Sequence, residues 1–277
     1  MSVNKVALVT GASSGIGADA ALRLKDAGYT VYGAARRVER MSSLQKAGVK
    51  PIALDVTDET SIRTVVDAIV GDSGRIDVLV NNAGYGSYGS IEDVPLDEAR
   101  AQIEVNLFGL ARLTQLVLPH MRAQRSGTVI NISSMGGKLV TPLGGWYHAS
   151  KYAVEALSDA LRIETAQFGI HIVVVEPGSI RTEWGSIAAQ KLKQTSGNGA
   201  YSSLADGVAT TLAASSEPGA RNTSGPEVVG KAIVKIARAR RPRTRYRVGF
   251  GAAPVMLLRW LLPDRAFDAI IRRAFNI

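Results

Sequence analysis

Short apolar runs alternate with amphipathic segments along most of the chain, and this alternation constrains the fold more than any other feature. Residues 6–9 (VALV) are apolar throughout, as strands buried on both faces are, and such strands need helices on both sides of the sheet. The pattern predicts an α/β fold with a doubly wound parallel sheet in a single domain. We expect strands at 6–9, 30–35, 51–54, 76–80, 128–132, 170–175 and 246–248, and helices at 18–27, 39–47, 58–69, 96–105, 107–124, 147–168 and 226–240, with a bend at Pro119.

Composition excludes several classes of site. The 277 residues suffice for one large domain with a buried core, and the absence of cysteine excludes disulfides, thiolate metal sites and a cysteine nucleophile. His120, His148 and His171 have no spacing that suggests a metal or a catalytic triad, so we assign them to structure and expect no metal. The first residues lack the apolar core of a signal peptide, which predicts a cytoplasmic protein. The longest apolar cluster, 252–262, is interrupted by Arg259 and is far shorter than the ~20 residues that span a bilayer.

The net charge of +9 is concentrated in the last part of the chain. Residues 1–230 hold 21 basic and 22 acidic side chains, a net of −1, whereas residues 231–277 hold 12 basic and 2 acidic ones, a net of +10. Such asymmetry can mark a nucleic-acid or membrane contact. We interpret it as a solvated face and expect no nucleic-acid partner.

A glycine-rich stretch, residues 10–17 (TGASSGIG), joins the first predicted strand to the first predicted helix. Small residues here let a pyrophosphate approach the backbone amides of a helix N-terminus, although a plain structural turn would have the same composition. Asp55 follows the third strand and is placed to accept from an adenine amino group. Residues 82–84 (NAG) follow the fourth strand and would line the adenosine half of the same crevice.

Tyr147 and Lys151 lie four residues apart at the start of a long predicted helix, so both side chains share one face. A phenol with an ordinary pKa near ~10 needs a nearby cation to act as an acid or base around neutrality, and Lys151 is placed to lower the pKa of Tyr147. Ser134, thirteen residues before Tyr147, follows a predicted strand that leads its hydroxyl to the same region. A surface tyrosine beside a lysine is the alternative interpretation of the pair.

Together these residues resemble the short-chain dehydrogenase/reductase family, in its compact single-domain branch, over nearly the whole chain. The matching motifs occur in family order: Thr10-Gly-x-x-x-Gly-x-Gly17, Asp55-Val56, Asn81-Asn82-Ala83-Gly84, Asn106, Ser134, Tyr147-x-x-x-Lys151 and Pro177-Gly178. The three-residue gap between Gly11 and Gly15 disfavours a sugar-nucleotide epimerase of the larger branch. The resemblance implies a Rossmann fold over residues 1–253 that binds a dinucleotide and carries the catalytic site.

The resemblance also implies a role for each catalytic residue. Tyr147 would protonate the carbonyl oxygen in reduction, or take the proton back in oxidation. Ser134 would donate to the developing alkoxide, with Ser133 as the alternative serine. Lys151 would also bind the nicotinamide ribose, and Asn106 would hold a relay water near Lys151.

The residues at the end of the second strand indicate whether the protein prefers NADP(H) or NAD(H). An NAD enzyme of this fold usually has a carboxylate there, whereas residues 34–37 are Ala-Ala-Arg-Arg, which favours NADP(H) over NAD(H). Arg36 is the first candidate for the 2′-phosphate and Arg37 the second. The predicted cofactor-binding residues are Gly11, Ser13, Ser14, Gly15, Ile16, Gly17, Arg36, Arg37, Asp55, Val56, Asn82, Ala83, Gly84, Tyr147, Lys151, Pro177, Gly178, Ile180 and Thr182.

The expected activity is interconversion of a ketone or aldehyde and an alcohol on a bulky apolar substrate. Residues 183–225 are rich in Ser, Ala, Thr and Gly without firm periodicity, and we interpret them as a mobile lid over the substrate. The expected pocket walls are Tyr85, Tyr88, Leu139, Val140, Leu143, Trp146 and Trp184. A homodimer or homotetramer is expected. The competing function is a non-catalytic regulator that binds NADPH.

The last segment, residues 254–277, is predicted to form two short helices divided at Pro263, as an extension of the same domain. In the second helix, apolar residues recur at helical spacing: Phe267, Ile270, Ile271, Ala274 and Phe275. We expect this stripe to pack over the substrate pocket or against a partner subunit. Contact with an anionic membrane is the alternative. The segment also bears a less specific resemblance to the 17β-hydroxysteroid and retinol dehydrogenase-like group.

Overall fold

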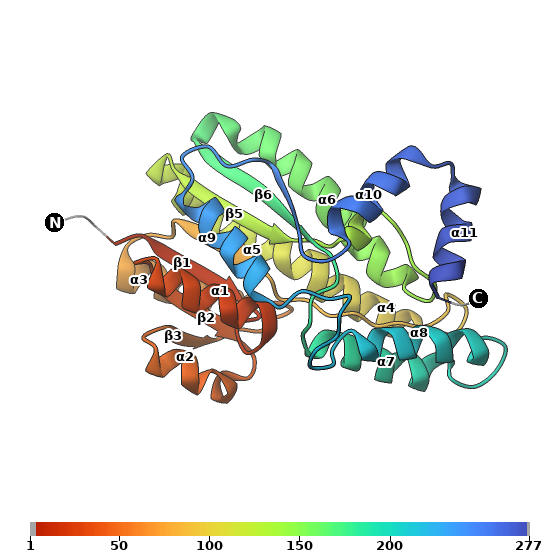
Figure 1. Ribbon diagram of the computed structural model, residues 1–277. Coiled ribbons are helices and arrows are strands. Elements are labelled where there is room, and N and C mark those ends of the chain that lie inside the picture. Colours follow the sequence, from red (N-terminus) through yellow and green to blue (C-terminus); the bar gives the residue numbers. More distant parts are fainter. Residues whose placement is uncertain (1–3, 276–277) are drawn as a thin grey trace.

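Seven strands form the central sheet of the structure, a computed structural model that describes residues 4–275. Their order is β3-β2-β1-β4-β5-β6-β7, and each neighbouring pair is parallel (Figure 1). The strands are β1 (Val6–Thr10), β2 (Thr30–Ala35), β3 (Lys50–Ala53), β4 (Val78–Asn81), β5 (Gly127–Ile132), β6 (Ile170–Pro177) and β7 (Arg245–Val248). The predicted doubly wound parallel sheet is confirmed.

Helices cover both faces of the sheet because successive strand residues point to opposite sides. In β1, Ala7 and Val9 belong to one buried apolar cluster, whereas Val6 and Leu8 belong to the other. The first face is covered by α1 (Gly15–Asp26), η1 (Val38–Met41), α2 (Ser42–Lys46) and α9 (Glu227–Arg238). The second face is covered by α3 (Glu59–Ser73), α5 (Leu110–Gln124) and α6 (Gly145–Thr165). The short η4 (Ala166–Phe168) follows α6. Three layers therefore enclose two apolar cores.

The direction in which the strands succeed one another reverses between β1 and β4. Strands β2 and β3 lie on one side of β1, and β4 to β7 follow on the other. Loops that leave the carboxyl ends of β1 and β4 therefore diverge and leave a crevice, which is where open α/β sheets bind ligands. The glycine-rich residues 10–17 and the 82–84 turn both stand at this edge.

The segment from residue 96 to 124 corrects one prediction. The sequence predicts separate helices on either side of Asn106, but α4 (Leu96–Ile103) continues through a π-helical segment, η2 (Glu104–Gly109), into α5. A π-turn accommodates extra backbone inside a helix, often at a functional site. Asn106 lies within it and is fully buried. Pro119 lies inside α5, and its predicted bend stays a prediction.

The segment from 183 to 225 is more regular than its composition suggests, since much of it is helical, and its role as a mobile lid stays a prediction. It forms α7 (Glu183–Ser196), which is capped by the Thr182 hydroxyl, and α8 (Ser202–Ala214). The inward residues are small, and at Gly185 a side chain would clash, since a Cβ there would lie 2.5 Å from the Leu212 carbonyl oxygen. Small residues let two helices pack closely, but they contribute little to an apolar periodicity, which is why the pattern is weak in the sequence.

The chain ends in α10 (Ala252–Leu261) and α11 (Asp264–Ala274), with the predicted break at Pro263 (Figure 1). Met256 and Phe267 from these helices pack with Leu139, in the loop that follows β5. Phe275, just beyond α11, packs against the α7–α8 cluster. The predicted packing of the C-terminal stripe on protein therefore holds for its buried side. Within residues 4–275, none of the helices combines the length and the hydropathy that crossing a bilayer requires.

Candidate active site

The glycine-rich loop between β1 and α1 has a backbone that side chains would obstruct. Gly11 and Gly15 have φ of 66° and 53°, in the left-handed region that favours glycine. A Cβ on Gly17 would lie 2.3 Å from the Gly11 carbonyl oxygen and 2.6 Å from the Asn82 amide nitrogen. The loop is therefore drawn tightly against the 82–84 turn, and its glycines are required by geometry.

Thr10 and Asn82 join the two loops that border the crevice. The Thr10 hydroxyl accepts from the backbone N–H groups of Asn82 and Ala83, at 3.0 and 2.9 Å. In return, the Asn82 side chain donates to the Thr10 carbonyl at 3.0 Å. Sequence reasoning includes Thr10 in the motif but misses this role, although a threonine at the carboxyl end of a buried strand is a usable signal.

The first turn of α1 fits a phosphate group. Ser14 stands at the N-cap, but its side chain accepts no capping hydrogen bond, and the first turn has no acidic residue. The amides at this end remain available as donors where the helix dipole favours an anion. Thr182 closes the opposite side, since a Cβ on Gly15 would lie 3.1 Å from its methyl group. The predicted residues Ser13, Ser14, Gly15, Ile16, Gly17 and Thr182 therefore lie together at the N-terminus of α1.

Arg36 and Arg37 follow the end of β2 and are exposed at the same edge. The Arg36 guanidinium is close enough to Asp55 to contribute to the lowering of its pKa, beside the hydrogen bonds from Thr57. Asp55 lies two residues beyond β3, and its Oδ1 accepts from the Thr57 N–H at 2.9 Å and from the Thr57 hydroxyl at 2.8 Å. One carboxylate oxygen is thus committed to the local turn, and its adenine contact stays a prediction.

Ser134, Tyr147 and Lys151 meet beyond the carboxyl end of β5. Ser134 caps the short η3 (Met135–Gly137), and its hydroxyl accepts from the Gly136 N–H at 3.0 Å. Tyr147 and Lys151 occupy the first two turns of α6, and both are buried. The Lys151 ammonium donates to the carbonyl of Ile132, the last residue of β5, at 2.9 Å. The strand and the helix therefore present the three predicted side chains at one place.

Ser134 is the serine that interacts with Tyr147. The Ser134 hydroxyl lies near enough to the Tyr147 phenol to act against the rise of its pKa, which favours the phenolate. The Ser133 hydroxyl is instead buried toward Glu155 and Gly137, without a hydrogen-bond partner among the described residues. The choice of Ser134 over Ser133 therefore agrees with the geometry.

Burial shifts the pKa values of Tyr147 and Lys151. Burial raises the pKa of Tyr147 to about 12, and the contact with Ser134 only partly opposes this. Burial also lowers the pKa of Lys151 to about 8, with the Glu155 carboxylate acting against it. Lys151 is not among the groups that shift the Tyr147 pKa in the protein alone, where its ammonium donates to the Ile132 carbonyl, so the predicted lowering by Lys151 stays a prediction. Both groups remain protonated at neutral pH.

Asn106 holds the π-turn against the loop after β4. Its amide oxygen accepts from the Tyr85 N–H at 3.0 Å, and its amide nitrogen donates to the Tyr85 carbonyl at 2.9 Å and to the Ser150 hydroxyl at 3.0 Å. The Ser150 hydroxyl in turn donates to the Tyr147 carbonyl at 2.7 Å. Both N–H donors of the Asn106 amide are thus used, and the expected relay water stays a prediction.

His148, assigned to structure from sequence, connects the loops around Ser134. Its Nε2 lies 2.9 Å from the Thr141 N–H, which can only donate, so Nε2 is the acceptor and Nδ1 carries the proton. Nδ1–H therefore donates to the Gly136 carbonyl at 3.0 Å. Because Gly136 also donates to Ser134, His148 positions the serine through one intervening residue. Burial lowers the pKa of His148, which favours this neutral form.

Aromatic side chains surround the Tyr147 ring. The Trp184 ring centroid lies 5.1 Å from that of Tyr147, and the Tyr88 centroid lies 5.9 Å away. Leu143 packs on the same cluster, which also includes the inner faces of α7 and α8. Two predicted walls lie elsewhere: Leu139 packs with the C-terminal helices, and Val140 is mostly exposed. The wall is therefore aromatic on the side that faces α7 and α8.

The Trp146 indole N–H is buried without a hydrogen-bond partner among the described residues. The Tyr85 ring lies under the Lys191 ammonium, 4.9 Å from its centroid. Tyr85 therefore contacts a side chain of α7. Neither residue belongs to the aromatic cluster at Tyr147, so their places as pocket walls stay predictions.

The turn after β6 brings residues 177–182 beside the crevice. Gly178 has no room for a side chain, since a Cβ would lie 2.0 Å from the Phe250 carbonyl oxygen. Ile180 forms a parallel bridge with Ser224, which fixes the chain before Thr182. This geometry is consistent with the predicted placement of Pro177, Gly178, Ile180 and Thr182 along a bound nicotinamide.

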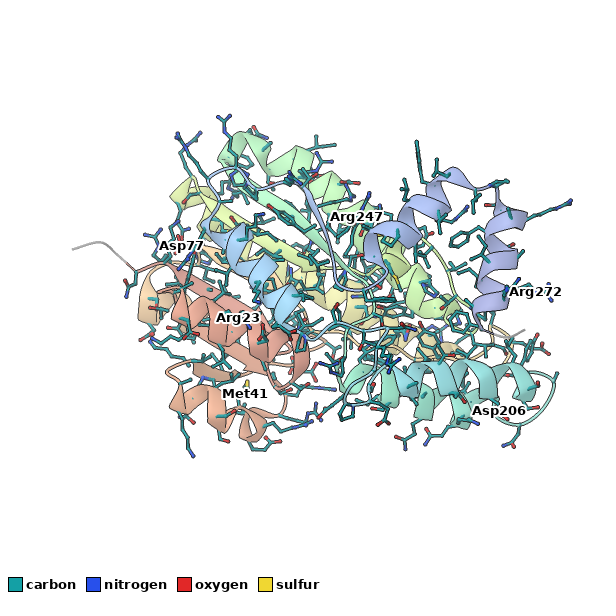
Figure 2. The ribbon with its side chains drawn as sticks, in the orientation of Figure 1. Arg23, Met41, Asp77, Asp206, Arg247 and Arg272 are labelled. Atoms are coloured by element: carbon teal, nitrogen blue, oxygen red, sulfur yellow. The ribbon has the colours of Figure 1, made fainter. Side chains whose placement is uncertain are left out.

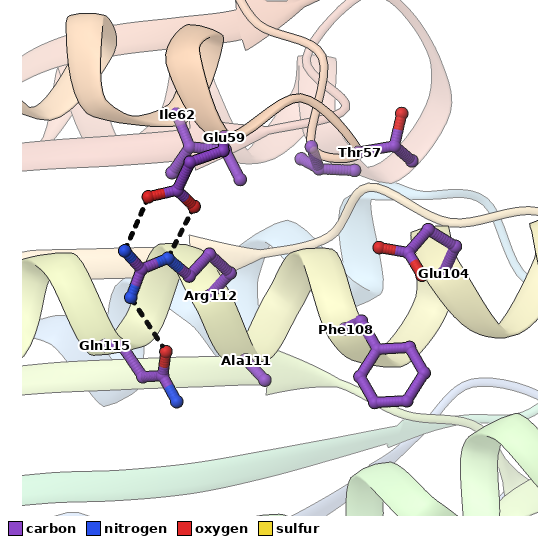
Figure 3. A pocket seen from close by; sticks show the side chains of 9 residues that line it. Thr57, Glu59, Ile62, Glu104, Phe108, Ala111, Arg112 and Gln115 are labelled. Carbon is purple, nitrogen blue, oxygen red and sulfur yellow. Dashed lines mark hydrogen bonds and ion pairs between the residues drawn. The ribbon is translucent and has the colours of Figure 1, made fainter.

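A separate hollow lies between α3 and α5 (Figure 3). Glu59 receives two hydrogen bonds from Arg112, at 2.6 and 2.5 Å, and Phe108 is exposed at its rim. Val56 is the one predicted site residue that lines this hollow. The hollow contains no catalytic group, and the described residues hold no His, Cys, Asp and Glu cluster suited to a metal.

Known proteins share this architecture. The family model of the short chain dehydrogenases matches residues 5–193. The 3-ketodihydrosphingosine reductase of Bacteroides thetaiotaomicron is 38% identical over 245 residues, 88% of each chain. The NADPH-dependent 3-dehydrocapnine reductase of Ornithobacterium rhinotracheale is 36% identical, over 96% of this chain and 95% of that protein. A short-chain dehydrogenase from Streptomyces avermitilis superposes with a TM-score of 0.80 at 36% identity, over 100% and 98% of the two chains.

Proposed function

The chain belongs to the short-chain dehydrogenase family, and on that premise we propose that this oxidoreductase is an NADP(H)-dependent carbonyl reductase acting on a bulky apolar ketone. The observation that carries the proposal is the meeting of Ser134, Tyr147 and Lys151 next to the glycine-rich cradle. Two hydroxyls can then face one carbonyl oxygen while a cation lies beneath them. A plain surface tyrosine would not be buried among these groups.

Proton transfer falls to Tyr147. A bound nicotinamide cofactor supplies the hydride for reduction and accepts it in the reverse direction. Tyr147 Oη donates a proton to the substrate oxygen, so that a ketone, one hydride and one proton give an alcohol. Ser134 Oγ donates a hydrogen bond to the same oxygen as negative charge develops there. Lys151 supports the phenolate that remains.

The raised pKa of Tyr147 bears differently on reduction and oxidation near neutrality. With its pKa raised to about 12 by burial, Tyr147 retains the proton that reduction consumes. Oxidation requires the phenolate as the base, which costs free energy until a cation is redirected to it. Lys151 could supply that charge if the ammonium turns from the Ile132 carbonyl toward the ribose and the phenol. We therefore propose that reduction can start from the protonated Tyr147, whereas oxidation first requires loss of its proton.

The preference for NADP(H) rests on the residues after β2. The strand ends at Ala35, and the next two side chains are exposed guanidiniums rather than a carboxylate. Arg36 would bind the 2′-phosphate with paired hydrogen bonds, and Arg37 is its neighbour. The NADPH dependence named for the Ornithobacterium relative supports the same choice.

The substrate class follows from the wall around Tyr147. Tyr88, Trp184 and Leu143 make this wall apolar and aromatic, and α7 and α8 extend it. Such a lining binds apolar surface and leaves orientation to the few polar groups. Two relatives are named as reductases of 3-ketodihydrosphingosine and 3-dehydrocapnine, which supports a ketone on a bulky apolar molecule for this chain.

A screen of NADPH oxidation against ketones and aldehydes of graded size tests the proposal. We expect turnover that increases with the apolar size of the ketone and exceeds the turnover with NADH. Binding of NADPH without turnover of any carbonyl compound would contradict it and would favour the regulator hypothesis.

A further inference from the structure

The outer face of α10 is apolar and carries no charged group that is free of an ion pair. Leu257, Trp260 and Leu261 are 51%, 80% and 59% exposed, and their spacing places them on one side of the helix. Ala253, one turn earlier, is also exposed on this side. Trp260 is the most exposed large apolar side chain among the described residues. A tryptophan so placed is costly in water unless another phase or molecule covers it.

The one charged residue of α10, Arg259, contributes no free charge to this apolar face. Arg259 pairs with Asp264 at 2.7 Å and lies over the Phe267 ring, 5.4 Å from its centroid. Its guanidinium therefore ties α10 to α11. The inner side of the pair is filled by Met256 and Phe267, which pack with Leu139. The two helices therefore form a folded unit whose outer face is exposed. This exposure does not result from fraying of the helices.

The neighbouring helix α11 carries exposed basic side chains. Arg265, Arg272 and Arg273 are exposed, and none of them is in an ion pair within residues 4–275. Figure 2 labels Arg272 near the C-terminal end of this helix. The remaining exposed carboxylate of α11 is Asp268, since Asp264 is paired with Arg259. The surface therefore combines an apolar stripe with an excess of positive charge.

We propose that the outer faces of α10 and α11 dock on an anionic lipid surface, with Leu257, Trp260 and Leu261 inserted at the headgroup level. Amphipathic helices bind membranes in this way, through buried apolar area together with the attraction of arginines to anionic lipids. Charge complementarity distinguishes this occupant from a second copy of the chain. In a twofold interface the same patch meets itself, so the arginines of the two copies would be brought together.

The docked orientation has a consequence for the site. The inner side of the helix pair packs with Met135, which directly follows Ser134 in the chain, and with Leu139. Phe275, at the other end of α11, packs with the cluster that includes Tyr147 and Trp184. A lipid surface on the outer side would therefore lie one helix layer from the groups that face the substrate.

Vesicle flotation with the full-length protein tests the proposal without depending on the reaction. We expect binding to vesicles that contain phosphatidylglycerol, weak binding to pure phosphatidylcholine, and a steep loss of binding with added salt. The variant L257S/W260S removes two inserted side chains, and its partition coefficient should fall roughly a hundredfold. Reversing two charges in R272E/R273E should weaken binding by about tenfold or more.

Ile163→Ser is the matched control, since Ile163 is 71% exposed on α6, on another part of the surface. It should bind vesicles as the unmodified protein does. The proposal is overturned if the unmodified protein does not bind anionic vesicles, or if L257S/W260S binds as tightly. It is also overturned if L257S/W260S changes the molar mass by light scattering, because a second copy would then be the occupant. Unchanged thermal melting establishes that each variant is folded.

Discussion

His148 offers a prediction that can be worked out from single hydrogen bonds. The imidazole accepts from the Thr141 N–H at 2.9 Å and donates to the Gly136 carbonyl at 3.0 Å. Each contact satisfies a buried backbone group, and leaving such a group unsatisfied costs about 1–3 kcal/mol. His148→Ala should therefore lower the free energy of unfolding by about 2–6 kcal/mol, measured by urea denaturation.

Two conservative variants separate stability from positioning. In His148→Asn, the amide NH2 can occupy the place of Nδ1–H and keep the Gly136 carbonyl as its acceptor. In His148→Gln, the amide oxygen can occupy the place of Nε2 and keep the Thr141 N–H as its donor. Each variant loses one of the two contacts, so both should lose about 1–3 kcal/mol. Only Asn retains the link through Gly136 to the Ser134 hydroxyl.

Activity should then differ between the two variants. Because a missing oxyanion donor costs about a hundred- to a thousandfold in kcat, a mispositioned Ser134 in His148→Gln should lower kcat by tenfold or more, up to about a hundredfold. The Asn variant should retain most of its kcat. Equal kcat values for Asn and Gln would refute the positioning role, whatever their stabilities.

The same histidine predicts a pH dependence of stability. Its pKa in the folded protein is lowered from 6.5 by burial, so the unfolded chain takes up its proton first as the pH falls. The stabilisation is fully present above pH 6.5 and is lost as the pH falls toward the folded pKa, with a slope of at most about 1.4 kcal/mol per pH unit. The corresponding slope should be absent in His148→Asn.

Three further predictions concern the cofactor and the proton. Arg36→Asp should weaken NADPH binding by placing a carboxylate beside the 2′-phosphate and should let NADH compete; fluorescence titration of both cofactors measures the ratio, and an unchanged ratio would assign the phosphate to Arg37 instead. Gly17→Ala should abolish cofactor binding, since its Cβ would lie 2.3 Å from the Gly11 carbonyl oxygen; calorimetric titration at full affinity would contradict the close contact. The pKa of Lys151 is lowered to about 8 by burial. Because the ammonium loses its charge as the pH rises through about 8, kcat/KM for reduction should decline there. A pH profile of kcat/KM that stays flat to pH 10 would contradict a catalytic role for that charge.

Much of the fold follows from the sequence because strands and helices alternate with distinct periods. Buried strands such as residues 6–9 have no polar face. The Asp58 side chain accepts from the Thr60 N–H and caps α3, as expected of an aspartate that precedes an amphipathic segment. The catalytic positions are recognisable for a related reason. Tyr147 and Lys151 share a helix, so their proximity is local, and Ser134 needs only the pairing of β5 with its neighbours.

The features that sequence reasoning misses depend on contacts between distant segments. The π-turn at Asn106 forms where its amide can bond to both backbone groups of Tyr85, and no local pattern encodes that pairing. Helices α7 and α8 pack closely at Gly185, and a sequence rich in such small residues resembles that of a loop. The raised pKa of Tyr147 is caused by burial, and the ammonium of Lys151 is directed to the carbonyl of Ile132 on β5, a contact that the spacing of Tyr147 and Lys151 on their helix does not reveal.

The central claim is that the Tyr147 hydroxyl is the proton donor, and Tyr147→Phe tests it most directly. The ring packs against Trp184 and Tyr88 and would remain in place, so only the hydroxyl is lost. We predict that kcat for ketone reduction falls by roughly a hundred- to ten-thousandfold, while NADPH affinity and thermal stability stay nearly unchanged. Substantial retained turnover, or a loss of activity that tracks a loss of NADPH binding, would contradict the assignment.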